Sequence, residues 1–211
     1  MDAVTWGVAV VAVLLGIAWY LSYSAARLDR LHARVEGALS ALDAQLVRRA
    51  EATLELANSG ALDPASGLIL AGAASESLEA HNERAGEDLL EGQHFAGREV
   101  IESDLTAALQ VALTPTVVVQ LRGDPGLAGE PALARVEAAA LRVQLARRFH
   151  NDAVKDVQRM RRKAVVRWFR LAGHADMPQT IEFDDELPGS SRDQGSPWDH
   201  GSARDHGAVR E

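Results

Sequence analysis

The sequence contains no cysteine among its 211 residues and is poor in aromatic side chains and lysine. Without cysteine it can form no disulfide framework, thiolate zinc site, iron–sulfur cluster or cysteine nucleophile. Aromatic residues make up 5% of the chain, and Lys155 and Lys163 are its only lysines. Because 30 acidic residues outnumber 22 basic ones, giving a net charge of -8, we expect no nucleic-acid partner.

The charges are unevenly distributed along the chain. Residues 51–104 hold two basic against twelve acidic side chains, whereas residues 135–170 hold eleven basic against three acidic ones. Residues 184–211 are acidic again, with three basic against seven acidic side chains. Opposite charges on neighbouring segments favour complementary faces within one fold, although two separately solvated faces are the simpler alternative.

An uncharged run of 19 residues, 3–21, lies near the N-terminus. At about 1.5 Å per residue, a helix of this length spans the hydrocarbon core of a bilayer, and Trp or Tyr side chains stand near both of its ends. A signal peptide cleaved near residues 24–26 is the alternative, but it would need a basic segment before a shorter apolar core. We therefore predict a retained transmembrane anchor over residues 1–24.

Basic residues next to the apolar run predict its orientation. Arg27, Arg30 and Arg34 follow the run, and no basic residue precedes it. The positive-inside rule then places the short N-terminus outside and the bulk of the chain in the cytosol. The expected location is the cytoplasmic membrane, with a single pass through the lipid bilayer.

Apolar residues after the anchor recur at steps of three and four from Leu28 to Leu54, as on one face of a helix. No proline occurs before Pro64, so the anchor is predicted to continue unbroken into a cytosolic helix that ends near residues 58–60. Asp63 and Pro64 predict the N-cap and first turn of a second helix reaching about residue 91.

The second half of the chain predicts two further helices, over residues 98–113 and 132–172, because both stretches are apolar at helical spacing and lack proline and internal glycine. The intervening residues 114–131 are expected to form a loop, in which Val117–Val119 could be a short strand. The polar composition from about residue 184 onward predicts disorder.

Together these elements predict an all-α protein. An N-terminal transmembrane helix continues into an up-down antiparallel four-helix bundle of long, coiled-coil-like helices over residues 25–175, followed by a disordered acidic tail over residues 176–211.

Two stretches resemble signatures of the LemA family. Val35–Arg49 reads VEGALSALDAQLVRR and Ala146–Val154 reads ARRFHNDAV, in the order that the family has behind its anchor. The chain departs from the family at Leu39 and His150, where the family has Trp and Tyr, so it resembles a divergent member. The resemblance implies a helical bundle on one anchor with no established activity, and its motif residues are Asp43, Gln45, Leu46, Arg48, Arg49, Ala146, Arg147, Phe149, Asn151, Asp152 and Val154.

Antiparallel packing would bring the two stretches together. If Leu28 lies level with about Arg170, residues of the two helices meet when their numbers sum to roughly 198. This register predicts ion pairs between Arg48 or Arg49 and Asp152, and between Asp43 and Lys155. Such pairs would fix helix register, and a binding surface built from the same residues is the alternative.

The end of the last helix is strongly basic and would return close to the membrane. Each Lys or Arg near an anionic leaflet contributes about 1 kcal/mol, so lipid contact is one hypothesis and pairing with the acidic helices is the other. The predicted lipid-contacting residues are Arg159, Arg161, Arg162, Lys163, Arg167, Trp168 and Arg170.

No catalytic motif survives inspection. Arg98–Glu102, which reads REVIE, is similar to the core of a Nudix box, but the carboxylate and glycine that should follow are missing. The histidines show no paired ligand spacing, and no Glu-x-x-His, phosphate loop or nucleophile elbow occurs. We therefore expect no enzyme, no metal and no cofactor.

Three function classes remain open. The first is a non-enzymatic membrane-anchored scaffold or adaptor with an unknown protein partner. The second is an organiser that engages anionic lipid, or a self-assembling oligomer, acting through the basic helix end. The third is a sensor that binds a small ligand or metal within the bundle.

Overall fold

A computed structural model of the protein describes residues 3–85, 95, 97–123, 128–162 and 177–186. The regular structure within these residues consists of helices alone, which confirms the predicted all-α class for the described part of the chain. The helices are α1 (Ala3–Ala57), α2 (Pro64–Ala85), α3 (Arg98–Ala112), α4 (Pro115–Gly123) and α5 (Gly129–Arg161).

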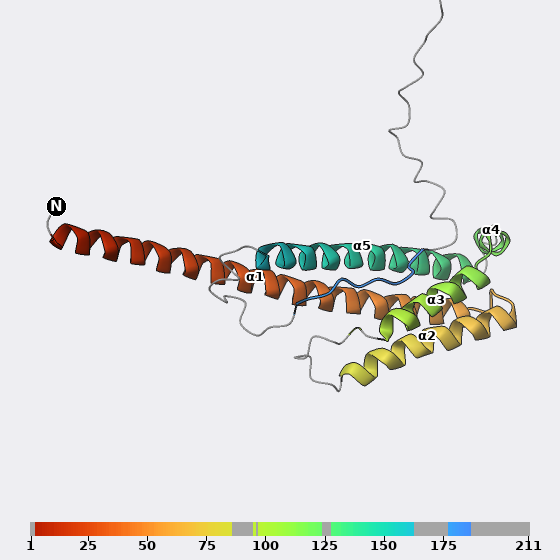
Figure 1. Ribbon diagram of the computed structural model, residues 1–211. Coiled ribbons are helices and arrows are strands. Elements are labelled where there is room, and N and C mark those ends of the chain that lie inside the picture. Colours follow the sequence, from red (N-terminus) through yellow and green to blue (C-terminus); the bar gives the residue numbers. More distant parts are fainter. Residues whose placement is uncertain (1–2, 86–94, 96, 124–127, 163–176, 187–211) are drawn as a thin grey trace, which may run out of the picture.

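Helix α1 is a single unbroken helix of 55 residues, or about 80 Å at 1.5 Å per residue. Its N-terminal half extends away from the other helices (Figure 1), and the most apolar 18-residue window of α1 is 0% buried. Its C-terminal half is buried from Leu28 onward by neighbouring helices. Among the described helices, α1 is the single straight helix long and apolar enough to cross a membrane, and the predicted continuation into the bundle is confirmed.

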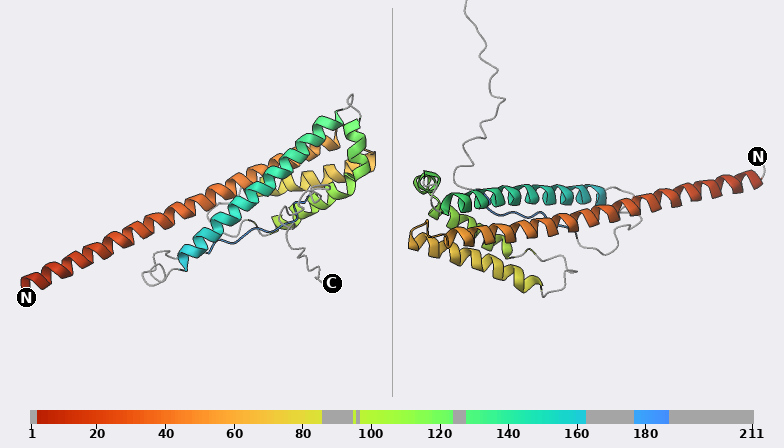
Figure 2. Two further views of the ribbon diagram at one scale, coloured as in Figure 1. Left: turned by 90° about the horizontal axis from the view of Figure 1, so that it is seen from above. Right: turned by 180° about the vertical axis from the view of Figure 1, so that it is seen from behind.

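The helices alternate in direction along the bundle, as predicted. Helix α2 turns back along α1, α3 follows α2, and α5 returns along another side of α1 (Figure 2). Packing differs along the length: among the described residues, the apolar cluster around Leu28 and Val35 joins α1 to α5, whereas the cluster around Leu56 also includes residues of α2, α3 and α4. Four-helix packing is therefore confined to the half of the bundle farther from the N-terminus.

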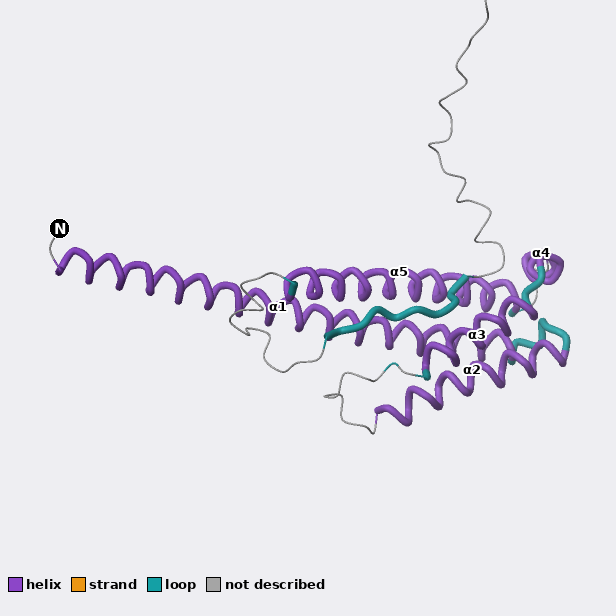
Figure 3. Tube along the Cα trace, viewed as in Figure 1, coloured by secondary structure: helices purple, strands orange, loops and turns teal. Residues whose placement is uncertain are grey.

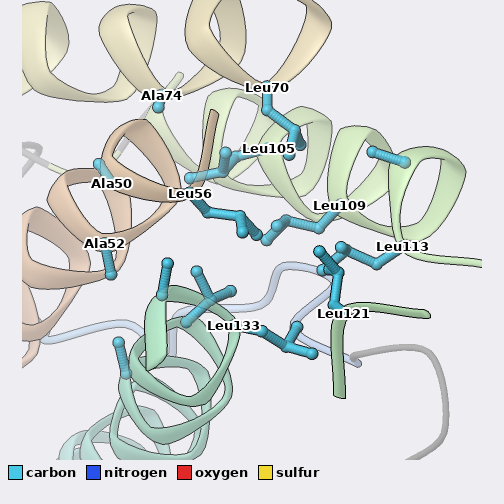
Figure 4. Close-up of a cluster of buried hydrophobic side chains, with 14 residues drawn as sticks. Ala50, Ala52, Leu56, Leu70, Ala74, Leu105, Leu109, Leu113, Leu121 and Leu133 are labelled. Carbon is cyan, nitrogen blue, oxygen red and sulfur yellow. The ribbon is translucent and has the colours of Figure 1, made fainter. Parts of the chain in front are cut away.

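The largest apolar cluster lies at this distal end. Leu56 of α1, Leu70 of α2, Leu109 of α3 and Leu133 of α5 are each at most 1% exposed and point toward one another (Figure 4). Burying a leucine side chain contributes about 1.5–3 kcal/mol, so this cluster supplies much of the stability of the bundle.

The connection between α1 and α2 matches its sequence signals. Gly60 has a φ of 73°, the left-handed conformation that favours glycine after a helix. Asp63 caps α2 by accepting the N–H groups of Ala65 and Ser66 at 3.1 and 3.0 Å. Hydrogen bonds from the Ser66 side chain and backbone lower the pKa of Asp63 below its usual value.

The segment after α3 was predicted as a loop with a possible strand at Val117–Val119, and this prediction is wrong. Residues 115–123 form α4, which meets α3 at a bend of 70°. Pro115 occupies the first turn, where a missing N–H costs nothing, and Leu121 is buried in the distal cluster. Burial of this leucine explains why the segment is helical despite its β-branched residues.

Helix α5 pairs with α1 in a different register from the predicted one. Arg34 lies 3.6 Å from Asp156, and Arg135 lies 2.6 Å from Glu55, so the numbers of each pair sum to 190 rather than to about 198. Leu28 packs against Val157 and Met160. The predicted register took the end of the apolar pattern near residue 172 as the level of Leu28, and residues 163–176 lie outside the described part of the chain.

Residues 177–186, hereafter the strap, run alongside α1 and α5 as an extended segment (Figure 3). The sequence assigned them to a disordered tail, but Ile181 and Phe183 are only 4% and 8% exposed and pack with Leu42, Leu46 and Val143. Apolar residues alternate here with exposed acidic ones, Glu182 and Asp184, so one face of the extended chain is buried. The predicted tail therefore starts too early, and residues 187–211 lie outside the described residues.

Candidate functional site

A cluster of charged side chains lies inside the bundle, halfway along its length. It joins Asp43 and Arg49 of α1 with Arg98 and Glu102 of α3, and we call these four residues the ionic centre. Arg49, Arg98 and Glu102 are at most 2% exposed. Two guanidinium groups balance two carboxylates, so the centre is formally neutral.

Glu102 is the hub of the ionic centre. Its Oε2 accepts a hydrogen bond from Arg49 Nη2 at 2.8 Å, and its Oε1 accepts from Arg98 Nε at 3.1 Å and from Ser77 Oγ of α2 at 2.9 Å. Arg49 also donates to the Glu102 carbonyl at 2.9 Å and to Thr106 Oγ1 at 3.0 Å. Both oxygens of a fully buried carboxylate are thus satisfied by partners from α1, α2 and α3.

Asp43 carries the network toward the surface. It is about one-third exposed, accepts a hydrogen bond from Arg98, and lies 3.0 Å from His81 Nδ1 of α2. Asp43 therefore connects α1 to both α2 and α3 at one level of the bundle. Buried charges of this kind cost desolvation energy and are better known for fixing register than for adding stability.

The strap covers the ionic centre from the side of α5. Thr106 Oγ1, which accepts from Arg49, donates to the backbone carbonyl of Asp184 at 2.7 Å. The ring of Phe183 lies 5.9 Å from the guanidinium carbon of Arg49 and 5.4 Å from that of Arg147, within cation–π range. The strap and the ionic centre therefore form one continuous site.

Arg147 of α5 anchors the acidic residues of the strap. It forms a bidentate pair with Asp185, with Nε–Oδ2 at 2.7 Å and Nη2–Oδ1 at 3.0 Å, and a further ion pair with Glu182 at 3.1 Å. Burial disfavours the charge of Arg147, but the hydrogen bond and charge of Asp185, with Glu182 and Asp184, outweigh it and raise the pKa of Arg147.

Four motif residues predicted from the family resemblance contribute directly to this site. Asp43 and Arg49 belong to the ionic centre, and Arg147 anchors the strap. Asn151 is buried and holds the backbone of Ile181, with its Nδ2 donating to the carbonyl at 3.0 Å and its Oδ1 accepting the N–H at 2.9 Å.

The remaining motif residues divide between the core and the surface. Leu46 and Val154 are buried in apolar clusters, and Ala146 packs beside Leu46. Gln45 is half-buried, whereas Arg48, Phe149 and Asp152 are exposed. The two stretches that carry the LemA resemblance thus pack against each other, in the shifted register.

The predicted ion pairs of Arg48 or Arg49 with Asp152, and of Asp43 with Lys155, are replaced by other partners. Arg49 pairs with Glu102 in the interior, while Asp152 is exposed on α5. Asp43 pairs with Arg98 and His81, while Lys155 is exposed. The physical reason is that Arg49 points toward α3 and not toward the outer side of α5.

The predicted lipid-contacting residues fall mostly beyond α5. Arg159 is exposed and lies 3.6 Å from Asp156, Arg162 is exposed, and Arg161 is half-buried. Lys163, Arg167, Trp168 and Arg170 lie outside the described residues. Because Met160 packs against Leu28, the described basic residues lie at the level of Arg27 and Arg30, next to the apolar half of α1.

Sequence reasoning missed Arg98, Glu102 and the strap. Arg98 and Glu102 were seen only as part of an incomplete Nudix-like motif, although their spacing of four places both on one helix face. The alternation of apolar and acidic residues from Ile181 to Asp185 was the signal for the strap.

The charged groups of the ionic centre are engaged with one another. No group of three or more His, Asp or Glu side chains in the described part of the chain is placed to hold a metal ion. Each charged group of the ionic centre is engaged by an opposite charge, so the site is suited to holding helices and the strap together.

The fold and site define an all-helical bundle whose first helix extends as an exposed apolar rod and whose outer groove holds an extended chain segment. Comparison of the chain with protein-family models, curated proteins and solved structures found no match.

Proposed function

We propose that this protein is a single-pass, membrane-anchored scaffold that holds a helical bundle on the cytosolic side of the cytoplasmic membrane and presents it to a protein partner. The observation that carries the proposal is the continuity of α1, whose exposed apolar half leads without a break into a half that is buried in the bundle. A helix that only completed a soluble core would bury its apolar residues.

The junction between the two halves supports a retained anchor. Residues 24–26, where a signal peptide could be cleaved, lie inside α1, and Ser24 is 4% exposed. Leu28, one turn further on, is 1% exposed against α5. Bundle packing thus begins at the end of the apolar run and leaves no flexible connection between them.

The resemblance to the LemA family supports the same proposal, because it implies a helical bundle on one anchor. The buried ionic centre, in which Arg49 and Arg98 each pair with Glu102, favours a structural role over an enzymatic one. The partner surface is proposed to lie on the bundle.

The absence of cysteine makes the topology directly testable. A single cysteine placed at the exposed Ala44 should react with a membrane-impermeant maleimide only after intact cells are opened. The chain should resist extraction by carbonate, and its mass should include residues 1–24. Labelling of Ala44→Cys from outside intact cells, or a mature chain that begins near residue 25, would overturn the proposal.

A second candidate function is contact with anionic lipid. The observation that favours it is the convergence of Arg27 and Arg30 of α1 with Arg159 and Arg162 of α5 at the end of the bundle nearest the apolar rod. All four are exposed, and each basic residue near an anionic surface contributes about 1 kcal/mol. In nanodiscs of different composition, this function predicts slower lipid exchange around the chain when the lipid is anionic, and Arg159→Ala with Arg162→Ala should reduce that difference.

A further inference from the structure

Side chains of α5 bind the backbone of the strap along its length, in addition to the side-chain contacts of Ile181, Phe183 and Asp185. Along α5, Gln158 donates to the carbonyl of Pro178 at 3.0 Å, Asn151 pairs with both backbone groups of Ile181, and Gln144 donates to the carbonyl of Asp185 at 2.7 Å. The partners on α5 run from residue 158 back to residue 144 as the strap runs from residue 178 to residue 185. The strap is therefore antiparallel to α5.

Helix α3 holds the other edge of the strap in the same way. Glu99 accepts the N–H of Glu182 at 3.0 Å, and Ser103 accepts the N–H of Asp184 at 3.2 Å. Thr106 and Gln110 donate to the carbonyls of Asp184 and Glu186 at 2.7 and 2.9 Å. Side chains from two helices therefore satisfy backbone donors and acceptors along an extended chain, as a neighbouring strand would in a sheet.

Backbone recognition of an extended segment, with pockets for alternate side chains, is a general mode of peptide binding. We propose that the groove between α3 and α5 is a peptide-binding site for an extended acidic segment of a partner protein, and that the strap occupies it as a resident competitor. The inference deepens the proposed scaffold function, because it names the surface and the kind of partner segment.

The groove defines the chemistry of the segment it accepts. One apolar side chain enters beside Leu42 and Val143, where Ile181 lies, and an aromatic ring two residues later enters between Arg49 and Arg147, where Phe183 lies. A carboxylate two residues further on meets the bidentate Arg147, as Asp185 does. The preferred segment therefore has the pattern apolar–x–aromatic–x–acidic, with further acidic residues favoured.

The helical bundle has a core that does not depend on the strap. The distal apolar cluster around Leu56 and Leu109, and the cluster joining Leu28 and Val35 to Val157, contain no strap residue. Strap residues enter only the third cluster, through Ile181 and Phe183. The strap can thus leave the groove while α1, α2, α3 and α5 remain packed on one another.

Competition with the strap sets the affinity that a partner needs. A segment tethered by a short linker acts at an effective concentration on the order of 1 mM. The apparent affinity of an added peptide is reduced by the fraction of chains whose groove is free. Weakening the strap should therefore strengthen binding of an added peptide, whereas fixing the strap in the groove should abolish it.

The first experiment fixes the strap in the full-length chain reconstituted in nanodiscs. Ser103→Cys with Asp184→Cys places two cysteines where the side chain of one residue contacts the backbone of the other, and no native cysteine interferes. The probe is a fluorescent peptide with the sequence of residues 177–186. The reduced chain should bind the probe, and the oxidised chain should lose binding by about tenfold or more. Equal binding by both forms would overturn the proposal.

The second experiment weakens the strap without a crosslink. Phe183→Ala in the full-length chain should raise the apparent affinity for the probe by about tenfold, since deletion of a buried aromatic side chain removes more than 1.4 kcal/mol from the competitor. Adding Asn151→Leu should remove that gain, because the groove then loses both bonds to the Ile181 backbone. The matched control is Asp152→Asn at the adjacent exposed position, which should leave the gain intact.

Two outcomes would overturn the proposal. If Phe183→Ala keeps its helical circular dichroism and binds no probe, the strap is a permanent part of the core and the proposal is wrong. If chains carrying only Ser103→Cys form intermolecular disulfides with chains carrying only Asp184→Cys, as readily as the double variant closes on itself, the occupant is a second copy and the proposed partner is wrong. Neither result alters membrane extraction or the labelling of Ala44→Cys, so the scaffold proposal can fail or stand separately.

Discussion

The two halves of α1 are continuous in backbone but opposite in what surrounds their side chains. In the first half, Leu14 and Ile17 are 59% and 43% exposed and the segment contains no charge from residue 3 to residue 21. In the second half, Leu42 and Leu46 are 0% exposed, and Arg49 is buried beside them at 1%. The exposed half is apolar and the buried half admits charge, the reverse of the pattern expected for a soluble helix.

The difference shows that burial and polarity have to be assigned with reference to the surrounding medium. An apolar exposed surface is stable where that medium is lipid, since the hydrocarbon core accommodates leucine and excludes charge. A buried arginine is stable only where an opposite charge pairs with it, as Glu102 pairs with Arg49. A different kind of substitution should therefore disrupt each half: removal of a paired charge in the buried half, and introduction of a charge in the exposed half.

The largest effect is expected in the buried half. Arg49→Ala removes one charge of a buried pair and leaves Glu102 with fewer donors, which typically costs about 3–5 kcal/mol. The free energy of unfolding of the bundle should fall by that amount in urea titrations followed by circular dichroism in nanodiscs. Arg49→Ala combined with Glu102→Gln should cost less than Arg49→Ala alone, and a loss below about 1 kcal/mol for the single variant would contradict the role given to the ionic centre.

A charge introduced into the exposed half should weaken membrane insertion and leave the free energy of unfolding of the bundle unchanged. Leu14→Arg is expected to disfavour insertion by about 2.5–3.5 kcal/mol, the cost of arginine near the centre of a membrane helix. The fraction of chain that resists carbonate extraction should drop, while urea unfolding of the bundle is unchanged. Leu14→Ala is the matched control, and equal extraction of Leu14→Arg and wild type would break the comparison between the two halves.

Mild acid should destabilise only the buried half. His150 is 3% exposed, and burial lowers its pKa below the usual value of about 6.5, so the folded chain binds this proton less readily than the unfolded chain does. Stability from neutral His150 is complete above about pH 6.5 and declines as the pH falls below it, by at most about 1.4 kcal/mol per pH unit.

Urea unfolding at pH 7 and pH 5.5 measures this decline, and His150→Gln should show a smaller one. The exposed half contains no His, Asp or Glu from residue 3 to residue 21, so the fraction of chain that stays with the membrane after a high-salt wash should be the same at pH 7 and pH 5.5. A decline that is the same in His150→Gln and in wild type would assign the acid sensitivity to other groups.

The smallest effect is expected at the surface of the buried half. Arg34 lies 3.6 Å from Asp156, but their side chains are 61% and 39% exposed, so solvent and salt screen the pair. Arg34→Ala should change the free energy of unfolding by about 0–1 kcal/mol in the same titration. A loss as large as that of Arg49→Ala would show that burial does not separate the two arginines.

Helix positions could be predicted from the sequence because local signals define them. The apolar period from Leu28 to Leu54, the cap at Asp63 and the absence of proline gave α1 and α3 with ends close to the observed ones, and the start of α2. The predicted end of α2 near residue 91 lies outside the described residues. Helix α4 was missed because its Pro, Gly and β-branched residues resemble a loop, and only the burial of Leu121 in the distal cluster makes the helix favourable.

The partners of each charged residue could not be predicted in the same way. Arg49 was predicted to pair with Asp152, but its partner Glu102 lies 53 positions away on a helix whose rotation no local pattern specifies. The register of α5 was wrong by two turns because the end of an apolar period was taken as a fixed level. The strap was overlooked because three apolar side chains in ten residues, Met177, Ile181 and Phe183, are too few to distinguish it from a polar tail.

The unbroken course of α1 makes the bundle turn as one body with the apolar rod. A helix rotates by about 100° and advances by about 1.5 Å per residue, so the number of residues between the rod and the bundle sets the direction in which the groove faces. Inserting one residue near Ser22 would swing the groove by about a quarter-turn relative to the rod, with every contact of the bundle intact. The length of α1 therefore sets the direction in which the groove and its strap face. A neighbouring protein anchored in the same membrane would have to approach from that side.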